Sequence, residues 1–300
     1  MSSIAGFFHS NQNFQEHPRL YRPCLEKMND VQKHRGSADS SIYLDVHCGL
    51  AFNQSVSGDP SPYFCRKNGR LYAVMLDGIL YNSDELKHDL SSWNWMFDRG
   101  SDAELFLKSF LQYGFDFASR LNGVFSAVIL DFSQRECYLY RDFFGTKPLF
   151  YTISKDGTLV FSSEIKGLFC YPGITPKLSS DGLNEIFSLG PARTPGNGVF
   201  DGVFEVPPAH CLIAAPEGTY QKPYWRLSCH PHEDDDKTTI EKISFLFQDA
   251  VERQMKGTAP FCTFLSGGVD SSLVSAICAK ILQKKGERLT TFSFDFSENS

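Results

Sequence analysis

The chain has 300 residues, of which 29 are Lys or Arg and 35 are Asp or Glu, and its formal net charge at pH 7 is −6. This balance gives no support to a protein that binds nucleic acid or an anionic membrane. No apolar run approaches the roughly 20 residues that span a bilayer, and the first residues form no signal core, so we expect a cytoplasmic protein. Nine cysteines without Cys-x-x-Cys spacing indicate reduced thiols rather than disulfides or a structural zinc site.

The first 220 residues show mainly the pattern of β-strands, in short alternating or buried apolar runs. One helix is expected over Pro23–His34, with Gly36 as its stop, and a second begins at the capping box Ser101-Asp102-Ala103-Glu104 and ends before Gly114. Many strands with few helices indicate packed antiparallel sheets under peripheral helices. The expected strands are Ile4–Phe8, Ile42–His47, Leu71–Leu76, Val124–Leu130, Glu136–Arg141, Pro148–Ile153, Thr158–Ser162 and Cys211–Ala215.

A polar run divides the chain at Ser228-Cys229-His230-Pro231-His232-Glu233-Asp234-Asp235-Asp236-Lys237. Cys229, His230 and His232 in this run form the only local ligand-like cluster of the sequence, and the polar surroundings favour a solvated linker over a metal site. We therefore expect a first domain over residues 1–220, a linker over 221–239 and a second domain over 240–300.

The second domain begins with an amphipathic helix and continues as strand, loop, helix and strand, which is one parallel βαβ unit. Its last strand is expected over Leu289–Phe296. One such unit cannot cover both faces of a parallel sheet, which normally has several strands. We expect that the sequence is a fragment of a longer protein. The apolar positions of the first helix are Ile240, Ile243, Phe247, Ala250 and Val251.

The loop of this unit is the run Leu265-Ser266-Gly267-Gly268-Val269-Asp270-Ser271-Ser272. A glycine turn between a strand and a helix directs backbone N–H groups and the positive end of the helix dipole at one spot, which favours an anion. Gly267 and Gly268 allow the backbone to approach it, and the three serines offer hydroxyl donors. Asp270 beside a polyphosphate indicates Mg²⁺ between the two anions. The run lacks the Gly-Lys-Ser/Thr ending of the Walker loop, and an ordinary strand-to-helix loop is the alternative.

This loop resembles the pyrophosphate loop of ATP-pyrophosphatase enzymes, and the whole chain resembles the asparagine synthetase family. The resemblance implies an α+β N-terminal nucleophile hydrolase fold with four α/β/β/α layers, followed by the start of an α/β adenine-nucleotide α-hydrolase-like domain. Further matches that carry it, in chain order, are Ile4–Phe8, His34–Gly36, Asp77–Asn82, Ser101–Glu104, Leu121–Phe125, Arg141–Tyr151, Ser162–Lys166 and Leu189–Gly196.

In the family Met1 is removed and a cysteine becomes the nucleophile, with its own α-amine as the base. This chain has Ser2 at that position. A hydroxyl is a far weaker nucleophile than a thiol, which is a few per cent thiolate at pH 7. A natural substitution and an introduced one both fit the sequence.

The family resemblance also implies a glutamine site. An asparagine side chain and the following glycine N–H bind the oxyanion, and an aspartate holds the glutamine α-amine. Asp77 replaces that asparagine, Gly78 follows it, and Asp102 matches the aspartate. Losing one oxyanion donor costs about 2.7–4 kcal/mol of transition-state stabilisation. We therefore expect an impaired glutaminase, unless Asp77 is protonated and donates.

The arginine that binds the glutamine carboxylate in the family is also missing. It is expected on a strand after His34-Arg35-Gly36, because a guanidinium binds a carboxylate through two hydrogen bonds. That stretch reads Gly49–Ser55 and contains no arginine. The alternative is that the alignment slips here, with Arg66 and Arg70 nearby in the sequence. The family proline that precedes Asp39 is absent as well.

For the synthetase half, the resemblance implies ATP and Mg²⁺, with the adenine beside the backbone of Leu265 and Phe294 and the pyrophosphate held from Ser266 to Ser272. It implies an amide-forming ligase that adenylates a carboxylate, such as that of aspartate, and aminates it with ammonia or glutamine. A lactam or peptide cyclase with a scaffold-only hydrolase domain is one alternative, and a non-catalytic nucleotide-binding protein is another. The oligomeric state is left open, with a homodimer as one option.

Overall fold

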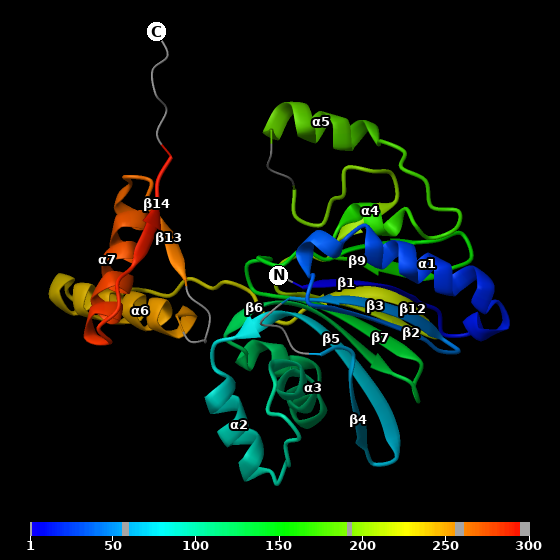
Figure 1. Cartoon of the computed structure of the whole chain (residues 1–300), viewed down its shortest axis with the longest axis horizontal. Coiled ribbons are helices and arrows are strands. Elements are labelled where there is room, and N and C mark those ends of the chain that lie inside the picture. Colours follow the sequence, from blue (N-terminus) through cyan, green and yellow to red (C-terminus); the bar gives the residue numbers. More distant parts are fainter. Residues whose placement is uncertain (1, 56–59, 191–193, 256–260, 295–300) are drawn as a thin grey trace. The chain divides into compact units, whose positions relative to one another are not determined.

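The computed structural model describes residues 2–55, 60–190, 194–255 and 261–294 (Figure 1). The chain divides into two compact units, Met1–Leu227 and Ser228–Ser300. The first unit contains two six-stranded antiparallel sheets. One sheet is built from β1 (Ser3–Phe8), β2 (Asp39–Leu44), β3 (Cys48–Gln54), β8 (Phe150–Ile153), β9 (Leu159–Ser162) and β10 (Val203–Glu205), in the order β10-β8-β9-β1-β3-β2. The other is built from β4 (Tyr63–Lys67), β5 (Arg70–Leu80), β6 (Gly123–Asp131), β7 (Glu136–Arg141), β11 (His210–Ala215) and β12 (Gly218–Pro223), in the order β12-β11-β7-β6-β5-β4.

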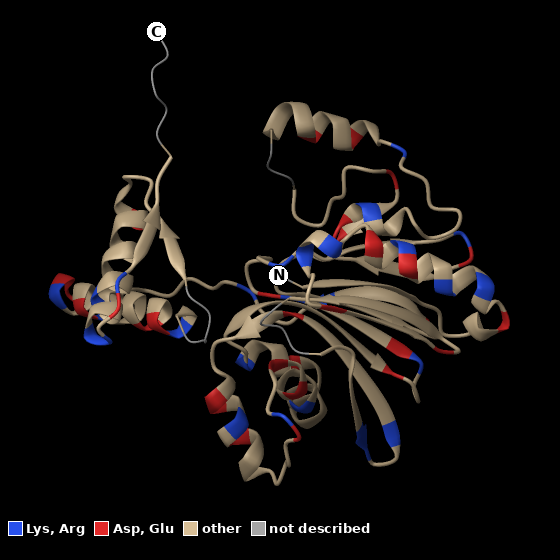
Figure 2. Cartoon of the chain, viewed as in Figure 1, with Lys and Arg blue, Asp and Glu red and all other residues tan. Residues whose placement is uncertain are grey.

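The sheets and helices of the first unit form the expected four α/β/β/α layers (Figure 1). One apolar cluster fills the space between the sheets, where Leu50 and Phe161 meet Met75 and Leu139. A second lies between the first sheet and α1, and a third between the second sheet and the α2–α3 pair. Charged residues lie mostly on helices and loops, and the strands carry few of them (Figure 2). The helices are α1 (Pro18–Asp30), α2 (Ser83–Ser92), α3 (Asp102–Tyr113), α4 (Ile165–Leu168) and α5 (Ser180–Leu189).

Several predicted boundaries are wrong for local reasons. The first helix begins at Pro18 rather than Pro23, because a proline is well suited to the first position of a helix, and Pro23 lies inside it. The expected strand Ile42–His47 runs across the turn between β2 and β3. By contrast, α3 begins as predicted, and Ser101 Oγ accepts a hydrogen bond from Glu104 N.

The expected linker over 221–239 is shorter at both ends. β12 continues to Pro223, which pairs with His210 of β11. The next helix, α6 (Asp236–Gln254), begins at Asp236 because the Asp235 side chain accepts a hydrogen bond from Thr238 N at 2.8 Å and so caps it.

The second unit contains α6, β13 (Cys262–Phe264), α7 (Val269–Lys284) and β14 (Thr290–Phe292), and β13 and β14 pair in parallel as expected. β14 is shorter than the predicted strand, whose last two residues lie outside the described residues. Thr263 Oγ1 and Ser275 Oγ, 2.8 Å apart, join β13 to α7. Among the described helices of both units, none has the length and apolar character needed to cross a membrane.

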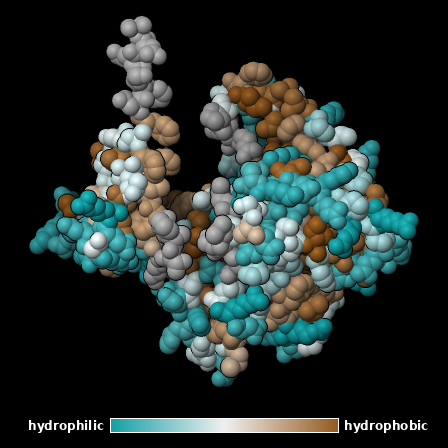
Figure 3. Space-filling view, in the orientation of Figure 1, coloured by the Kyte–Doolittle hydropathy of each residue, from teal (hydrophilic) through white to brown (hydrophobic). Residues whose placement is uncertain are grey.

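Helix α5 of the first unit exposes its large apolar side chains and turns a small and a polar residue inward. The side of α5 that lies against the loop of residues 197–199 holds Gly182, which is packed against Val199, and Glu185, which accepts a hydrogen bond from Asn197. Its large apolar residues are exposed instead, with Phe187 at 85%. Figure 3 shows hydrophobic colour over this helix.

Candidate active sites

Ser2 lies just before β1, in the middle of the first sheet, and it is only 5% exposed. Its backbone N–H donates to Asp77 Oδ1 at 3.1 Å, and its carbonyl oxygen accepts from Arg35 Nε at 3.1 Å. Its hydroxyl oxygen accepts from Ser55 N at 3.2 Å. All three polar groups of this residue are therefore engaged with side chains or backbone of the hydrolase unit.

Asp77 lies on the face of β5 that looks toward the other sheet, and it is 1% exposed. Besides Ser2, its carboxylate accepts from Arg35 Nη2 at 3.0 Å and from Lys147 Nζ at 3.1 Å. Two cationic side chains therefore face the carboxylate, and in each of these contacts Asp77 is the acceptor. The negative charge is balanced by these cations, and Asp77 accepts hydrogen bonds at the position where the resemblance places an oxyanion donor.

Lys147 reaches this site from a tightly held loop after β7. Asp142 accepts hydrogen bonds from the N–H groups of Phe125, Phe144, Thr146 and Lys147. The buried Arg141 donates to the carbonyl oxygen of Lys147 at 2.9 Å. The backbone of Lys147 is therefore fixed on both sides, which directs its side chain at Asp77.

Arg35 extends the charge cluster to Glu164, at 3.7 Å, and Glu164 also pairs with His34 at 2.7 Å and with Lys166 at 3.0 Å. Partial burial opposes the charge of Glu164. Hydrogen bonds from Lys166 and His34 outweigh it and hold the pKa of the Glu164 carboxyl below its usual value. The result is a continuous network of ion pairs across the end of the two-sheet sandwich.

Gly78 and Asp102 have structural partners. A Cβ on Gly78 would stand 2.4 Å from the carbonyl oxygen of Val124, so β5 and β6 can approach here only with glycine. Asp102 accepts from Leu80 N at 2.9 Å and from Ser83 Oγ at 2.6 Å. It therefore ties the end of β5 to α2 and the start of α3.

The structure brings a different arginine to the site from those considered in the sequence. Arg66 and Arg70 lie at the β4–β5 hairpin, and Arg70 is seven residues from Asp77 along an extended strand, or roughly 23 Å. Arg35 is the guanidinium beside Ser2. Arg35, Lys147 and Glu164 all belong to motifs that carry the family resemblance, and that membership was the signal available in the sequence for assigning them a role.

In the second unit the predicted pyrophosphate loop lies between β13 and α7. Gly267 has a φ of +82°, a conformation that favours glycine, and Gly268 is the N-cap of α7 without a capping side chain. Ser271 Oγ accepts from Ser266 N at 3.2 Å and lies 2.9 Å from Ser266 Oγ. The loop is thus braced by its own serines, and no side chain caps the first turn of the helix.

These residues fit a polyphosphate. A Cβ on Gly267 would have no neighbour within 4 Å, so the backbone at this turn is open to a ligand. Asp270 and Ser272 stand in the first turn of α7 and could hold Mg²⁺ together with a phosphate oxygen. Leu265 and Phe294 are the residues predicted to lie beside the adenine. The Leu265 N–H donates to Phe292 O at 2.8 Å, and the Phe294 side chain is 83% exposed. Among the described residues no group of three His, Cys, Asp or Glu side chains could hold a metal by itself. The cluster of Cys229, His230 and His232 is therefore not such a group.

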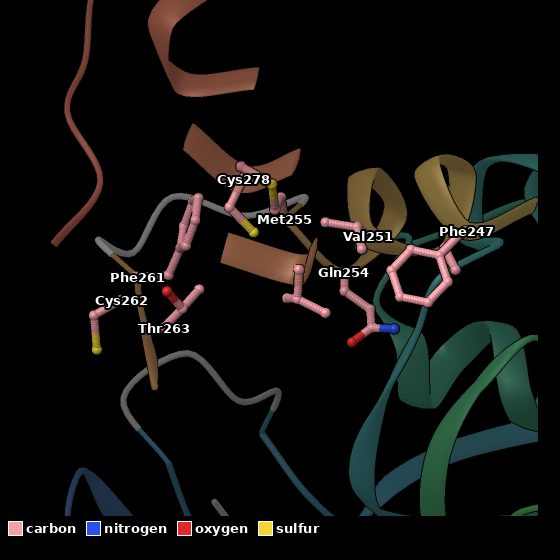
Figure 4. A pocket seen from close by; sticks show the side chains of 10 residues that line it. Phe247, Val251, Gln254, Met255, Phe261, Cys262, Thr263 and Cys278 are labelled. Atoms are coloured by element: carbon pink, nitrogen blue, oxygen red, sulfur yellow. The ribbon is translucent and has the colours of Figure 1, made fainter. Parts of the chain in front are cut away.

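A separate apolar pocket of about 380 Å³ occupies the second unit. It is lined by side chains from α6, β13 and α7, among them Val251, Met255 and Cys278 (Figure 4). The residues from Ser266 to Ser272 do not line it. This pocket is therefore distinct from the predicted phosphate loop.

Comparison with known families matches each unit separately. Residues 1–225 match the glutamine amidotransferase domain model, and residues 242–300 match the asparagine synthase model. The chain is 37% identical over 284 residues to asparagine synthetase [glutamine-hydrolyzing] 3 of Bacillus subtilis, covering 93% of this chain and 46% of that protein. It is 31% identical over 278 residues to amidase chry2 of Gibberella zeae, covering 88% and 40%. The chain spans about half the length of these curated relatives.

Solved structures agree on the fold. The allosteric regulatory enzyme of purine biosynthesis superposes with a TM-score of 0.55 at 15% identity, covering 99% of this chain and 66% of that one. At this identity the likeness concerns the fold alone.

Proposed function

Because the chain belongs to the glutamine-hydrolysing asparagine synthetase family, we propose that it serves an ATP-dependent ligase whose hydrolase unit no longer releases ammonia from glutamine. The ligase reaction would be adenylation of a carboxylate, with aspartate as the first candidate, followed by amination with ammonia. ATP supplies the activating group, and Ser266 to Ser272 with Mg²⁺ would hold its pyrophosphate.

The observation that carries the proposal is the environment of Asp77. Acyl transfer from glutamine requires donors directed at the oxygen where negative charge develops. Here Ser2 N–H, Arg35 and Lys147 all direct their protons at the Asp77 carboxylate. In these contacts the residue at the oxyanion position accepts hydrogen bonds and donates none.

The same carboxylate also contacts the group that would serve as the base of the reaction. Removal of Met1, as in the family, would turn the Ser2 nitrogen into the α-amine that must accept the proton of the nucleophile. Asp77 Oδ1 lies 3.1 Å from that nitrogen and would hold the amine in a hydrogen bond. The weaker serine nucleophile adds to the loss of the oxyanion donor.

The test is to determine which amine donor the full-length protein accepts. With Mg²⁺, ATP and aspartate, we expect ammonium chloride to support pyrophosphate release and asparagine formation, and glutamine to support neither. Equal rates with glutamine would contradict the proposal. Release only with a larger amino acid or a peptide that carries its own amine would select the cyclase-like alternative. ATP binding without turnover on any acid would select the non-catalytic one.

A further inference from the structure

We draw no further inference here: the strongest candidate, the exposed apolar face of α5 formed by Leu183, Ile186 and Phe187, carries no proposal because nothing in the part of the chain that the structure describes shows what covers it.

Discussion

The polar motifs of the two units differ in how far their atoms are buried and hydrogen-bonded by the fold. In the hydrolase unit Ser2 and Asp77 are 5% and 1% exposed, and their polar atoms are paired with each other or with Arg35, Lys147 and Ser55. In the synthetase unit the loop before α7 has an uncapped helix start, and Val269 is 83% exposed. A motif can bind a ligand only where its donors are not already used by the fold. By this criterion the uncapped backbone at the start of α7 fits the proposed ligand, although Ser266 and Ser271 bond each other, whereas the polar atoms of Ser2 and Asp77 are already engaged by the fold.

The largest effect is expected from breaking the closed site. Asp77→Asn leaves Arg35 and Lys147 largely buried beside a neutral amide, so the free energy of unfolding should fall by about 3–5 kcal/mol. Urea denaturation measures this change. Asp201→Asn is the matched control, since Asp201 pairs with Lys177 on the surface with 58% and 76% of the side chains exposed, and it should cost less than about 1 kcal/mol. Equal effects of the two substitutions would show that the Asp77 cluster is not a buried network.

The open loop should be sensitive in activity rather than in stability. Gly267→Val places a β-branched residue at a φ of +82°, which displaces the backbone donors of the turn. We expect pyrophosphate release with ammonia to fall roughly a hundredfold, the scale of losing one well-placed donor. Gly286→Val is the control, because Gly286 has a φ of +76° and open space around it at the other end of α7. A comparable loss of activity in both variants would assign the effect to strain alone.

A third prediction concerns acid stability of the hydrolase unit. Glu104 is buried, and although burial opposes its charge, Lys108 and the N–H groups of Asp98, Arg99 and Gly100 hold its pKa at about 2 instead of 4.5. The unfolded chain therefore takes up this proton first. The stabilisation is complete above the unfolded pKa and is lost as the pH falls from about 4.5 toward 2.

Glu104→Gln should remove this pH dependence and cost about 1–3 kcal/mol near neutral pH. Denaturation curves at several pH values between 2 and 7 provide the measurement. If the variant and the unsubstituted protein lost stability in parallel below pH 4.5, Glu104 would not be the group responsible.

The smallest expected effect is a difference in thiol reactivity between cysteines of the two units. Cys229 and Cys262, both in the second unit, are exposed and should react with a thiol reagent in the native protein. Cys24, Cys48, Cys137 and Cys211 of the first unit are buried. Burial raises the pKa of the Cys24 thiol to about 12, so it and the other three should react only after unfolding. Mass spectrometry of the labelled peptides identifies the sites, and early labelling of Cys137 would contradict the closed core.

The features that could be predicted from the sequence are those set by neighbouring residues. The strand Glu136–Arg141 has the predicted bounds, and α3 begins at its capping box because both partners lie within three residues. The beginning of α1 was missed, since Pro23 reads as a helix start. β3 is absent from the strands predicted by pattern, and only the family resemblance placed a strand over Gly49–Ser55. Ser2 and Asp77 were chosen by motif, and the structure does bring them together.

Arg35 and Lys147 lie in matched motifs, but their pairing with Asp77 could not be predicted, because they come from distant segments. Arg35 is 42 residues away from it in the chain and Lys147 is 70. Neither residue lies on a periodic pattern, and each reaches Asp77 only after the two sheets have packed. The sequence therefore indicated a lost oxyanion donor, and it could not indicate that the lost donor was replaced by a charge-balanced network.

The most direct test of the closed hydrolase site is the rate of glutamate release from saturating glutamine by the full chain, compared with that of a Ser2→Ala variant. A coupled glutamate assay, run on a preparation that releases pyrophosphate with ammonia, separates a closed site from an inactive protein. We predict that the two glutamate rates are equal within the background. A rate at least about tenfold above that of the Ser2→Ala variant would mean that Ser2 acts as a nucleophile beside a charged Asp77, and the account would be wrong.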